Sequence, residues 1–387
     1  MNEFLLLFLL LPVAAASGWY LAVFRSRGKA RQSTRLSRNY FRGLNYLLNE
    51  EPDKAIELFM EIAEVNRDTV ETHLALGKLF RRRGEMDKAI RFHKHIISRP
   101  NLSDDQRRQA LMALGEDYMQ AGLLDRAERL FSELLLIDPG NPAPVRQLLA
   151  IYQQEKDWAK AIDMAAHLGT EKDDVRQMVA QFYCEQAELA LADDDPDRVM
   201  AALRQARRYD PRHPRSRLLE AALAHRLDQW QKVAVLLREA CELEPGCLVG
   251  SIDRLLESHH QTGSLDDLKA WLASMVERHR STTATLALAE LLLDEDPEAA
   301  LAVLLEQLAY RPSVKGLEHL MALLHEQKVG FDRVEPQRIR DLARSLLKGQ
   351  PSYRCSHCGF SGSSLHWLCP SCRQWNTTRA ITGVLGE

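Results

Sequence analysis

The chain has 387 residues, of which 45% are hydrophobic and 27% charged, fractions ordinary for a folded protein of two or three domains or one repeat array. Its formal net charge is −3, so no overall positive field favours binding to nucleic acid. The charge is unevenly spread, because seven basic residues lie from Arg25 to Arg42 and no acidic residue lies between Glu3 and Glu50.

The N-terminal segment is apolar and uncharged over the 21 residues Phe4–Phe24, enough for a helix of about 30 Å, one hydrocarbon core. The aromatic pair Trp19–Tyr20 suits a membrane interface. The alternatives are a cleaved signal peptide, suggested by the small residues Ala14–Ser17, and a buried core helix. A signal peptide, however, carries positive charge before its apolar core, whereas the basic residues of this chain all follow it. We therefore expect a transmembrane anchor at 1–24 and a basic juxtamembrane linker at 25–34, with the basic side in the cytoplasm.

The middle of the chain repeats a short motif whose alanines are 34, 38 and 34 residues apart, at Ala55, Ala89, Ala127 and Ala161. A glycine stands twelve residues before each of the first three alanines, at Gly43, Gly77 and Gly115. This spacing resembles the tetratricopeptide repeat, a 34-residue helix–turn–helix. Because one repeat cannot bury its apolar face alone, the sequence predicts an all-α superhelical solenoid of about eight or nine repeats over residues 35–348.

Small residues mark where the two helices of a repeat meet. We expect the glycine of the first helix and the alanine of the second to permit close approach, with Phe131 filling the gap toward the next repeat. Asp53, Asp87 and Asp125 are placed to cap the second helices. Later repeats are less regular and carry Val199, Val233, Leu268 and Ala300 near the alanine position. The generic use of such a solenoid is to bind another chain on its concave face, but the pattern does not identify the contact residues.

The C-terminal region 349–387 holds four of the seven cysteines, as Cys355-x-x-Cys358 and Cys369-x-x-Cys372. Two such turns can close a tetrahedron of sulfurs around a metal ion. Gly359 supplies the positive φ that such a turn often needs. The pattern resembles a rubredoxin-like ribbon, in which four thiolates accept iron or zinc.

Other residues carry weaker signals. His357 and His366 are interpreted as residues near the four-sulfur site that are not ligands. Trp367 and Trp375 are interpreted as covering that site or packing it onto the last helices. The cysteines outside the ribbon are interpreted as buried apolar residues, and the histidine pairs of the solenoid as surface or interface residues, because their spacing does not suit a metal. These residues are Cys184, Cys241 and Cys247, and His93, His95, His259 and His260.

No P-loop, dinucleotide-binding glycine motif, nucleophile elbow or HExxH motif occurs in the sequence. A closed four-sulfur site leaves no open coordination position, so the sequence favours a protein that is not an enzyme. Only three arginines lie near the ribbon, too few for a convincing phosphate-binding surface. They are Arg354, Arg373 and Arg379.

The order of anchor, basic segment, repeat solenoid and four-cysteine ribbon is a specific arrangement. Short segments of the sequence also carry a resemblance to a known family. They are Leu10–Ala16 with Gly18–Tyr20, Arg35–Arg38 with Tyr40, Ala121–Leu123 with Asp125–Glu128, Tyr353–Cys355 with Cys358–Phe360, and Cys369–Arg373 with Trp375. From end to end the chain resembles the bacterial lipopolysaccharide assembly protein B family, and all four ribbon cysteines match.

That resemblance implies a single-pass protein of the bacterial inner membrane, with most of the chain on the cytoplasmic side. It implies an adaptor that works beside the membrane-bound ATP-dependent metalloprotease FtsH and promotes destruction of the deacetylase that commits precursors to lipid A. It also implies a second membrane protein that senses lipopolysaccharide and restrains the adaptor. The ligands it implies are Cys355, Cys358, Cys369 and Cys372, for one iron or zinc ion. The alternatives are a scaffold that gathers lipopolysaccharide synthesis enzymes without proteolysis and a rubredoxin-like electron-transfer protein.

Overall fold

The computed structural model describes residues 70–100, 102–169, 171–311, 313–326, 347–384 and 386, with single positions or short runs at 41–43, 45–46, 54–55, 57–58, 340 and 343–344. These residues divide into two compact units, Met1–Leu168 (unit 1) and Gly169–Glu387 (unit 2). No helix within these ranges combines the length and apolar character needed to cross a bilayer. The predicted anchor at 1–24 and linker at 25–34 lie outside the described residues.

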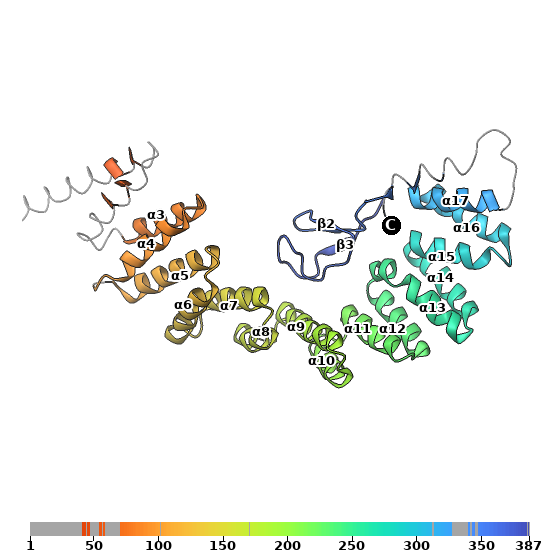
Figure 1. The fold of residues 1–387 in the computed structure, drawn as a ribbon, viewed down its shortest axis with the longest axis horizontal. Coiled ribbons are helices and arrows are strands. Elements are labelled where there is room, and N and C mark those ends of the chain that lie inside the picture. Colours follow the sequence, from red (N-terminus) through yellow and green to blue (C-terminus); the bar gives the residue numbers. More distant parts are fainter. Residues whose placement is uncertain are drawn as a thin grey trace, which may run out of the picture. The chain divides into compact units, whose positions relative to one another are not determined.

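Unit 1 is built from helices that alternate in direction and pack as hairpins along the chain (Figure 1). Its described elements are α3 (Val70–Arg82), α4 (Met86–Ile97), α5 (Asp104–Gln120), α6 (Leu124–Ile137), α7 (Pro142–Glu155), α8 (Trp158–Ala165) and η2 (Ala166–Leu168). We call the first helix of each hairpin helix A and the second helix B.

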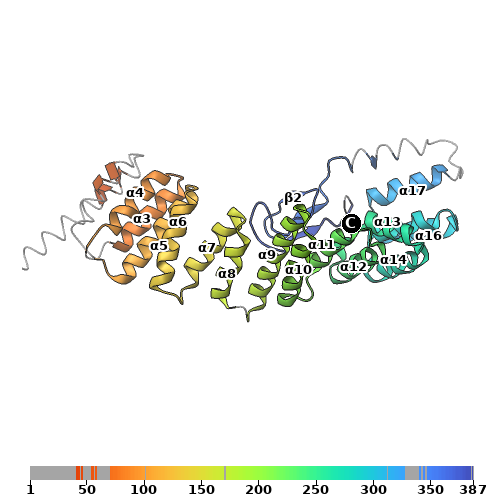
Figure 2. The same ribbon diagram turned by 60° about the horizontal axis from the view of Figure 1, so that its bottom comes forward.

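Unit 2 continues the same hairpin pattern and ends in a small sheet (Figures 1 and 2). Its helices are α9 (Asp173–Ala192), α10 (Pro196–Tyr209), α11 (Pro214–Arg226), α12 (Trp230–Leu243), η3 (Pro245–Gly250), α13 (Ile252–Thr262), α14 (Leu265–His279), α15 (Thr282–Leu292), α16 (Pro297–Tyr310) and α17 (Val314–Glu326). Its strands are β1 (Tyr353–Cys355), β2 (Ser361–Gly362) and β3 (Thr378–Ala380).

One column of small or apolar side chains, all on helix B, is fully buried along the described chain. Its members are Ala55, Ala89, Ala127, Ala161, Val199, Val233, Leu268 and Ala300. The alanine register read from the sequence therefore continues through the irregular repeats of unit 2. The prediction of a mostly helical tetratricopeptide-like solenoid with a small C-terminal ribbon is confirmed.

The glycines of helix A face a ring on helix B. A Cβ atom on Gly115 would stand 2.5 Å from Cε1 of Phe131, and one on Gly77 would stand 2.2 Å from Nε2 of His93. Because both distances are far below van der Waals contact, only glycine fits there. Phe131 was predicted to fill the gap toward the next repeat, but its ring covers the glycine of its own hairpin.

The prediction that Asp87 and Asp125 cap helix B is wrong. The N-cap residues are Glu85 and Leu123, neither of which makes a side-chain capping bond, and both aspartates lie in the first helical turn. There a carboxylate interacts favourably with the positive end of the helix dipole. Asp53 lies outside the described residues. Elsewhere aspartates do cap helix B through a side-chain hydrogen bond, at Asp157, Asp195 and Asp296.

The ribbon is a three-stranded antiparallel sheet in the order β2-β1-β3. Tyr353 pairs with Gly362 on one side and with Ala380 on the other. An isolated bridge between Leu368 and Trp375 closes the remaining loop. This short sheet buries little apolar surface of its own, so its stability depends on the cysteine site and on the helices beside it.

Candidate metal centre

The first cysteine turn begins where β1 ends. The backbone N–H of Cys355 donates to the carbonyl of Phe360 at 2.7 Å, and the N–H of Gly359 donates to the carbonyl of Cys355 at 3.0 Å. Gly359 has φ +80°, as the sequence predicted for this turn. These bonds bring the side chains of Cys355 and Cys358 to one side of the turn.

The second cysteine turn has the same geometry. The N–H of Cys369 donates to the carbonyl of Gln374 at 3.0 Å, and the N–H of Arg373 donates to the carbonyl of Cys369 at 2.9 Å. Arg373, one residue after Cys372, has φ +53° and so occupies the position of the glycine in the first turn. From the sequence Arg373 was noted only as a basic residue near the ribbon and not as a turn residue, because a positive φ at an arginine has no signal in the pattern.

The two turns bring all four sulfurs together. The Sγ atoms of Cys355, Cys358, Cys369 and Cys372 lie within 4.8 Å of one another. Two pairs are 3.7 Å apart, Cys355 with Cys372 and Cys358 with Cys369. A tetrahedral ion with metal–sulfur bonds of about 2.3 Å requires sulfurs about 3.8 Å apart, so the donor set fits a four-coordinate iron or zinc ion.

The electrostatics of the cluster also favour a cation. The Thr377 hydroxyl, 3.2 Å from the sulfur, lowers the pKa of Cys355 to about 6. The backbone N–H of Phe360 lowers the pKa of Cys358. Burial raises the pKa of Cys372 to about 12, and the neighbouring cysteines add to that rise. Four thiolates at this distance repel one another, so a bound metal ion is what would hold all of them deprotonated.

The four cysteine residues differ in their exposure to solvent. Cys355 and Cys369 are buried, Cys372 is half-buried and Cys358 is exposed. The cysteines outside the ribbon are buried, and burial raises the pKa of Cys184 and Cys247 to about 12 and that of Cys241 still further. These three thiols are protonated at neutral pH, as expected for buried apolar residues.

The ribbon docks on unit 2 through its two tryptophans. Trp375 packs edge-to-face on Phe182 of α9, with ring centroids 5.9 Å apart. Beside it, the Gln181 side-chain N–H donates to the Asn376 amide oxygen at 2.6 Å. Trp367 packs on His213, the N-cap residue of α11, with centroids 6.2 Å apart. From the sequence we expected the two tryptophans to cover the site or to pack it on the last helices of the solenoid. The structure instead places their rings on α9 and on the N-cap residue of α11.

Further contacts extend the docked surface along the chain. Arg379 of β3 forms an ion pair of 3.3 Å with Glu244, and a Cβ atom on Gly250 of η3 would stand 3.3 Å from the Tyr353 hydroxyl. The N–H of Val314 donates to the carbonyl of Val384 at 2.8 Å. The ribbon therefore contacts α9, the N-cap residue of α11, the residue that ends α12, η3 and the start of α17.

The solenoid histidines do not form metal sites in the described part of the chain. His93 is fully buried and bonds to the carboxylate of Asp117. His259 is also buried, and its Nδ1 lies 2.7 Å from the Ser264 hydroxyl. Their neighbours His95 and His260 are more exposed. Within the described residues, only the four ribbon cysteines meet the geometry of a metal site.

Known proteins resemble this chain both in its single domains and over nearly its whole length. Residues 353–379 match the family described as "Rubredoxin metal binding domain", and residues 72–104 match "Tetratricopeptide repeat". Lipopolysaccharide assembly protein B of Escherichia coli strain K12 is 37% identical over 385 residues, 98% of this chain and 99% of that protein. The protein of the same name from Haemophilus influenzae is 33% identical over 393 residues, 97% and 98% of the two chains. A solved tetratricopeptide repeat protein from Parabacteroides merdae is 12% identical, with a TM-score of 0.34 over 72% of this chain and 99% of its own.

Proposed function

The chain belongs to the lipopolysaccharide assembly protein B family, and on that premise we propose that it is an adaptor that limits lipopolysaccharide synthesis at the bacterial inner membrane. The observation that carries the proposal is the match to the family over nearly the whole chain, helices and ribbon included. Its immediate partners would be FtsH and the deacetylase that commits precursors to lipid A. A membrane protein that senses lipopolysaccharide would restrain it.

The solenoid suits such a role because it offers a long surface for other proteins. Stacked hairpins leave available those helix A faces that the ribbon does not cover, and different partners can bind to different repeats. An anchor at 1–24 would hold this surface beside a membrane protease. That arrangement raises the effective concentration of the partners without any new contact between them.

The ribbon suits a structural part in this role. Cys355, Cys358, Cys369 and Cys372 would hold one iron or zinc ion, which would fix the fold of the ribbon. Trp367 and Trp375 then fasten the ribbon to α11 and α9. Metal binding in the ribbon would in this way control the surface that unit 2 presents.

The test measures the lifetime of the deacetylase after protein synthesis is stopped. Raised levels of this chain should shorten that lifetime in cells with active FtsH and leave it unchanged in cells without FtsH. Cys369→Ser should weaken the effect, whereas His357→Ala, a change at an exposed ribbon residue between two cysteines, should not. An unchanged deacetylase lifetime in the presence of the protease would contradict the adaptor role. Co-purification with synthesis enzymes of normal lifetime would favour the scaffold alternative.

A second candidate function, electron transfer, is favoured by one observation. The Cys358 residue is exposed, so the cluster lies close to the surface, where a four-sulfur iron centre can exchange an electron with a partner. This reading predicts a coloured iron protein that is reduced and reoxidised reversibly. A colourless protein with one zinc ion per chain and no redox couple would exclude it.

A further inference from the structure

Unit 1 contains an open groove of about 480 Å³ between the helix A elements α3, α5 and α7. The volume falls within the range of ordinary ligand pockets, about 300–1,000 Å³. Its floor is apolar, formed by Leu74, Ala75, Met112, Ala113, Leu134 and Pro144. We refer to it as the α3–α5–α7 groove.

The walls of the groove are held in place by a buried charge network. Arg81 of α3 pairs with Asp117 at 2.8 Å and Glu116 at 2.5 Å, and it also donates to the Ala113 carbonyl at 3.0 Å, all on α5. Asp117 in turn bonds to the fully buried His93. Because a buried pair is costly to break, α3 and α5 keep a fixed separation, and the groove exists before any ligand arrives.

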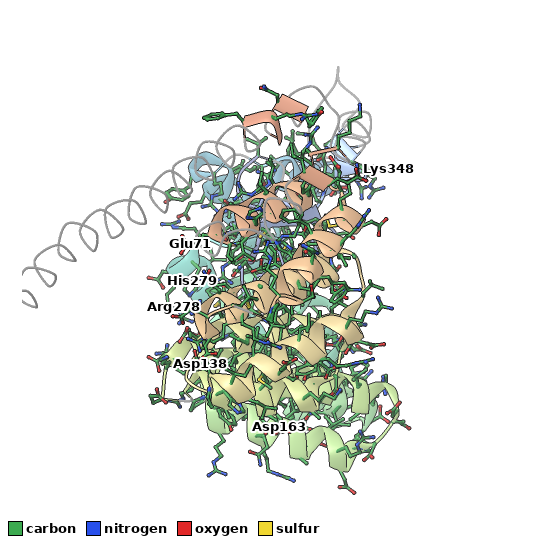
Figure 3. The ribbon with its side chains drawn as sticks, turned by 90° about the vertical axis from the view of Figure 1, so that its left-hand side faces the viewer. Glu71, Asp138, Asp163, Arg278, His279 and Lys348 are labelled. Carbon is green, nitrogen blue, oxygen red and sulfur yellow. The ribbon has the colours of Figure 1, made fainter. Side chains whose placement is uncertain are left out.

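Two carboxylates of the groove lining form no ion pair within the part of the chain that the structure describes. Glu116 is paired with Arg81, and Asp105 is paired with Arg108. By contrast, Glu71 on α3 and Asp138 at the end of α6 form no ion pair with any described residue. Both lie on one side of unit 1 (Figure 3). Lys78, the remaining cation of the lining, lies two helical turns from Glu71, about 10 Å along α3.

Unit 2 shows what a helix A face of this chain accepts. There the occupant is the chain's own ribbon, which contributes two indole rings that pack on Phe182 and His213. It also contributes one arginine, Arg379, which pairs with Glu244 where α12, a helix B, ends beside that face. A large apolar side chain and a neighbouring cation are thus the two elements that the docked ribbon supplies. The α3–α5–α7 groove offers a matching surface, an apolar floor with two lining carboxylates that pair with no cation among the described residues.

We propose that the α3–α5–α7 groove binds a segment of a partner protein that carries a large apolar side chain next to a lysine or arginine. The apolar side chain lies on the floor at Ala75 and Met112, and the cation pairs with Glu71 or with Asp138. The inference deepens the proposed adaptor function and rests on it for the existence of a partner. It assigns partner binding to unit 1, because the corresponding face of α9 and α11 is covered by the ribbon.

The test uses the full chain in detergent micelles and a phage-displayed library of random twelve-residue peptides. Enriched peptides are expected to combine a large apolar residue with a neighbouring lysine or arginine. By fluorescence anisotropy, the double variant Glu71→Lys, Asp138→Lys should bind the consensus peptide at least about tenfold more weakly, and so should Met112→Glu. The matched control is Asp163→Lys, an exposed acidic residue of α8 outside the groove lining (Figure 3).

Four outcomes would overturn the proposal: acidic consensus peptides, peptides that bind the double variant as tightly as the wild type, no enrichment at all, or self-association of the chain that the double variant abolishes. The last outcome would make the groove an interface between copies of this chain. The result is independent of the deacetylase lifetime. Peptide binding with an unchanged lifetime would contradict the adaptor role alone, and a shortened lifetime without peptide binding would contradict the groove alone.

Discussion

Trp375, at the end of the second cysteine turn, packs on Phe182, which lies 193 positions earlier in α9, with the two rings nearly perpendicular at 70°. Phe182 is fully buried, whereas Trp375 is half-buried. An edge-to-face pair of this kind contributes about 0.5–1.5 kcal/mol beyond its area burial. The ribbon is therefore not structurally independent of the repeat helices, because this contact couples its stability to theirs.

Trp375→Ala should loosen the ribbon from α9 without unfolding the repeats. A half-buried tryptophan contributes less than the 3–5 kcal/mol of a fully buried one, so we expect a loss of about 2 kcal/mol in the opening free energy of the ribbon. Amide hydrogen exchange of residues 368–380 should then be about 30-fold faster. Phe360→Ala is the control, since that ring packs on His366 within the ribbon. Equal exchange in Trp375→Ala and wild type would show that the aromatic pair does not hold the ribbon.

Removal of the metal should release the ribbon and expose part of α9 and α11. Structural zinc in small peptides supplies about 10–16 kcal/mol of apparent binding energy, and a ribbon this small has no comparable apolar core. We expect a chelator, or Cys369→Ser, to make the ribbon sensitive to protease and to increase exchange at Gln181 and Phe182. Cys241→Ser, at a buried thiol of α12, is the control for loss of a cysteine alone. Unaltered protease resistance after complete metal removal would contradict the structural role.

His213 should make the folded state of unit 2 sensitive to mild acid. Burial, followed by the nearby Arg215 and Arg217, lowers the pKa of His213 from 6.5 to about 4. The unfolded chain therefore takes up a proton below pH 6.5, while the folded chain does not until about pH 4. Stability is fully present above pH 6.5 and falls as the pH drops toward 4, by about 2 kcal/mol at pH 5.

The measurement compares urea unfolding of the wild type and His213→Gln at pH 7.5 and pH 5. Other groups titrate in this range, and the metal site binds protons too, so the informative quantity is the difference between the two proteins. The stability lost between the two pH values should be about 2 kcal/mol smaller in His213→Gln. Parallel losses in the two proteins would mean that His213 is not the group responsible.

Local patterns in the sequence predicted the repeats and the four sulfurs, because both depend on residues close in the chain. The helix B column from Ala55 to Ala300 follows from a period of about 34 residues, and each cysteine turn spans only a few positions. The docking of the ribbon could not be predicted in the same way. Gln181 and Asn376 are 195 residues apart, and no spacing rule relates them.

The exceptions within the repeats have a physical cause as well. His93 occupies the position in α4 that Phe131 occupies in α6, four residues after the column alanine, and both rings cover a glycine. The sequence pattern gave no reason to place a histidine inside, because burial there depends on the carboxylate of Asp117 in the next hairpin. The arginine at the second cysteine turn is a similar case, since its left-handed backbone is imposed by the turn.

Gly115→Ala should destabilise unit 1 although alanine is the better helix former. The added Cβ would stand 2.5 Å from the Phe131 ring, and overpacking of a core typically costs about 1–3 kcal/mol. The gain in helix propensity returns at most about 1 kcal/mol, so we expect a net loss of about 1–2 kcal/mol. Phe131→Leu in the same chain should restore part of that loss by removing the clashing ring atoms. Gly140→Ala is the control, because nothing lies within 4 Å of its added Cβ, and its unfolding free energy should change by less than about 0.5 kcal/mol. Urea unfolding followed by circular dichroism measures all three variants, and equal stability of Gly115→Ala and Gly140→Ala would contradict the role assigned to the ring contact.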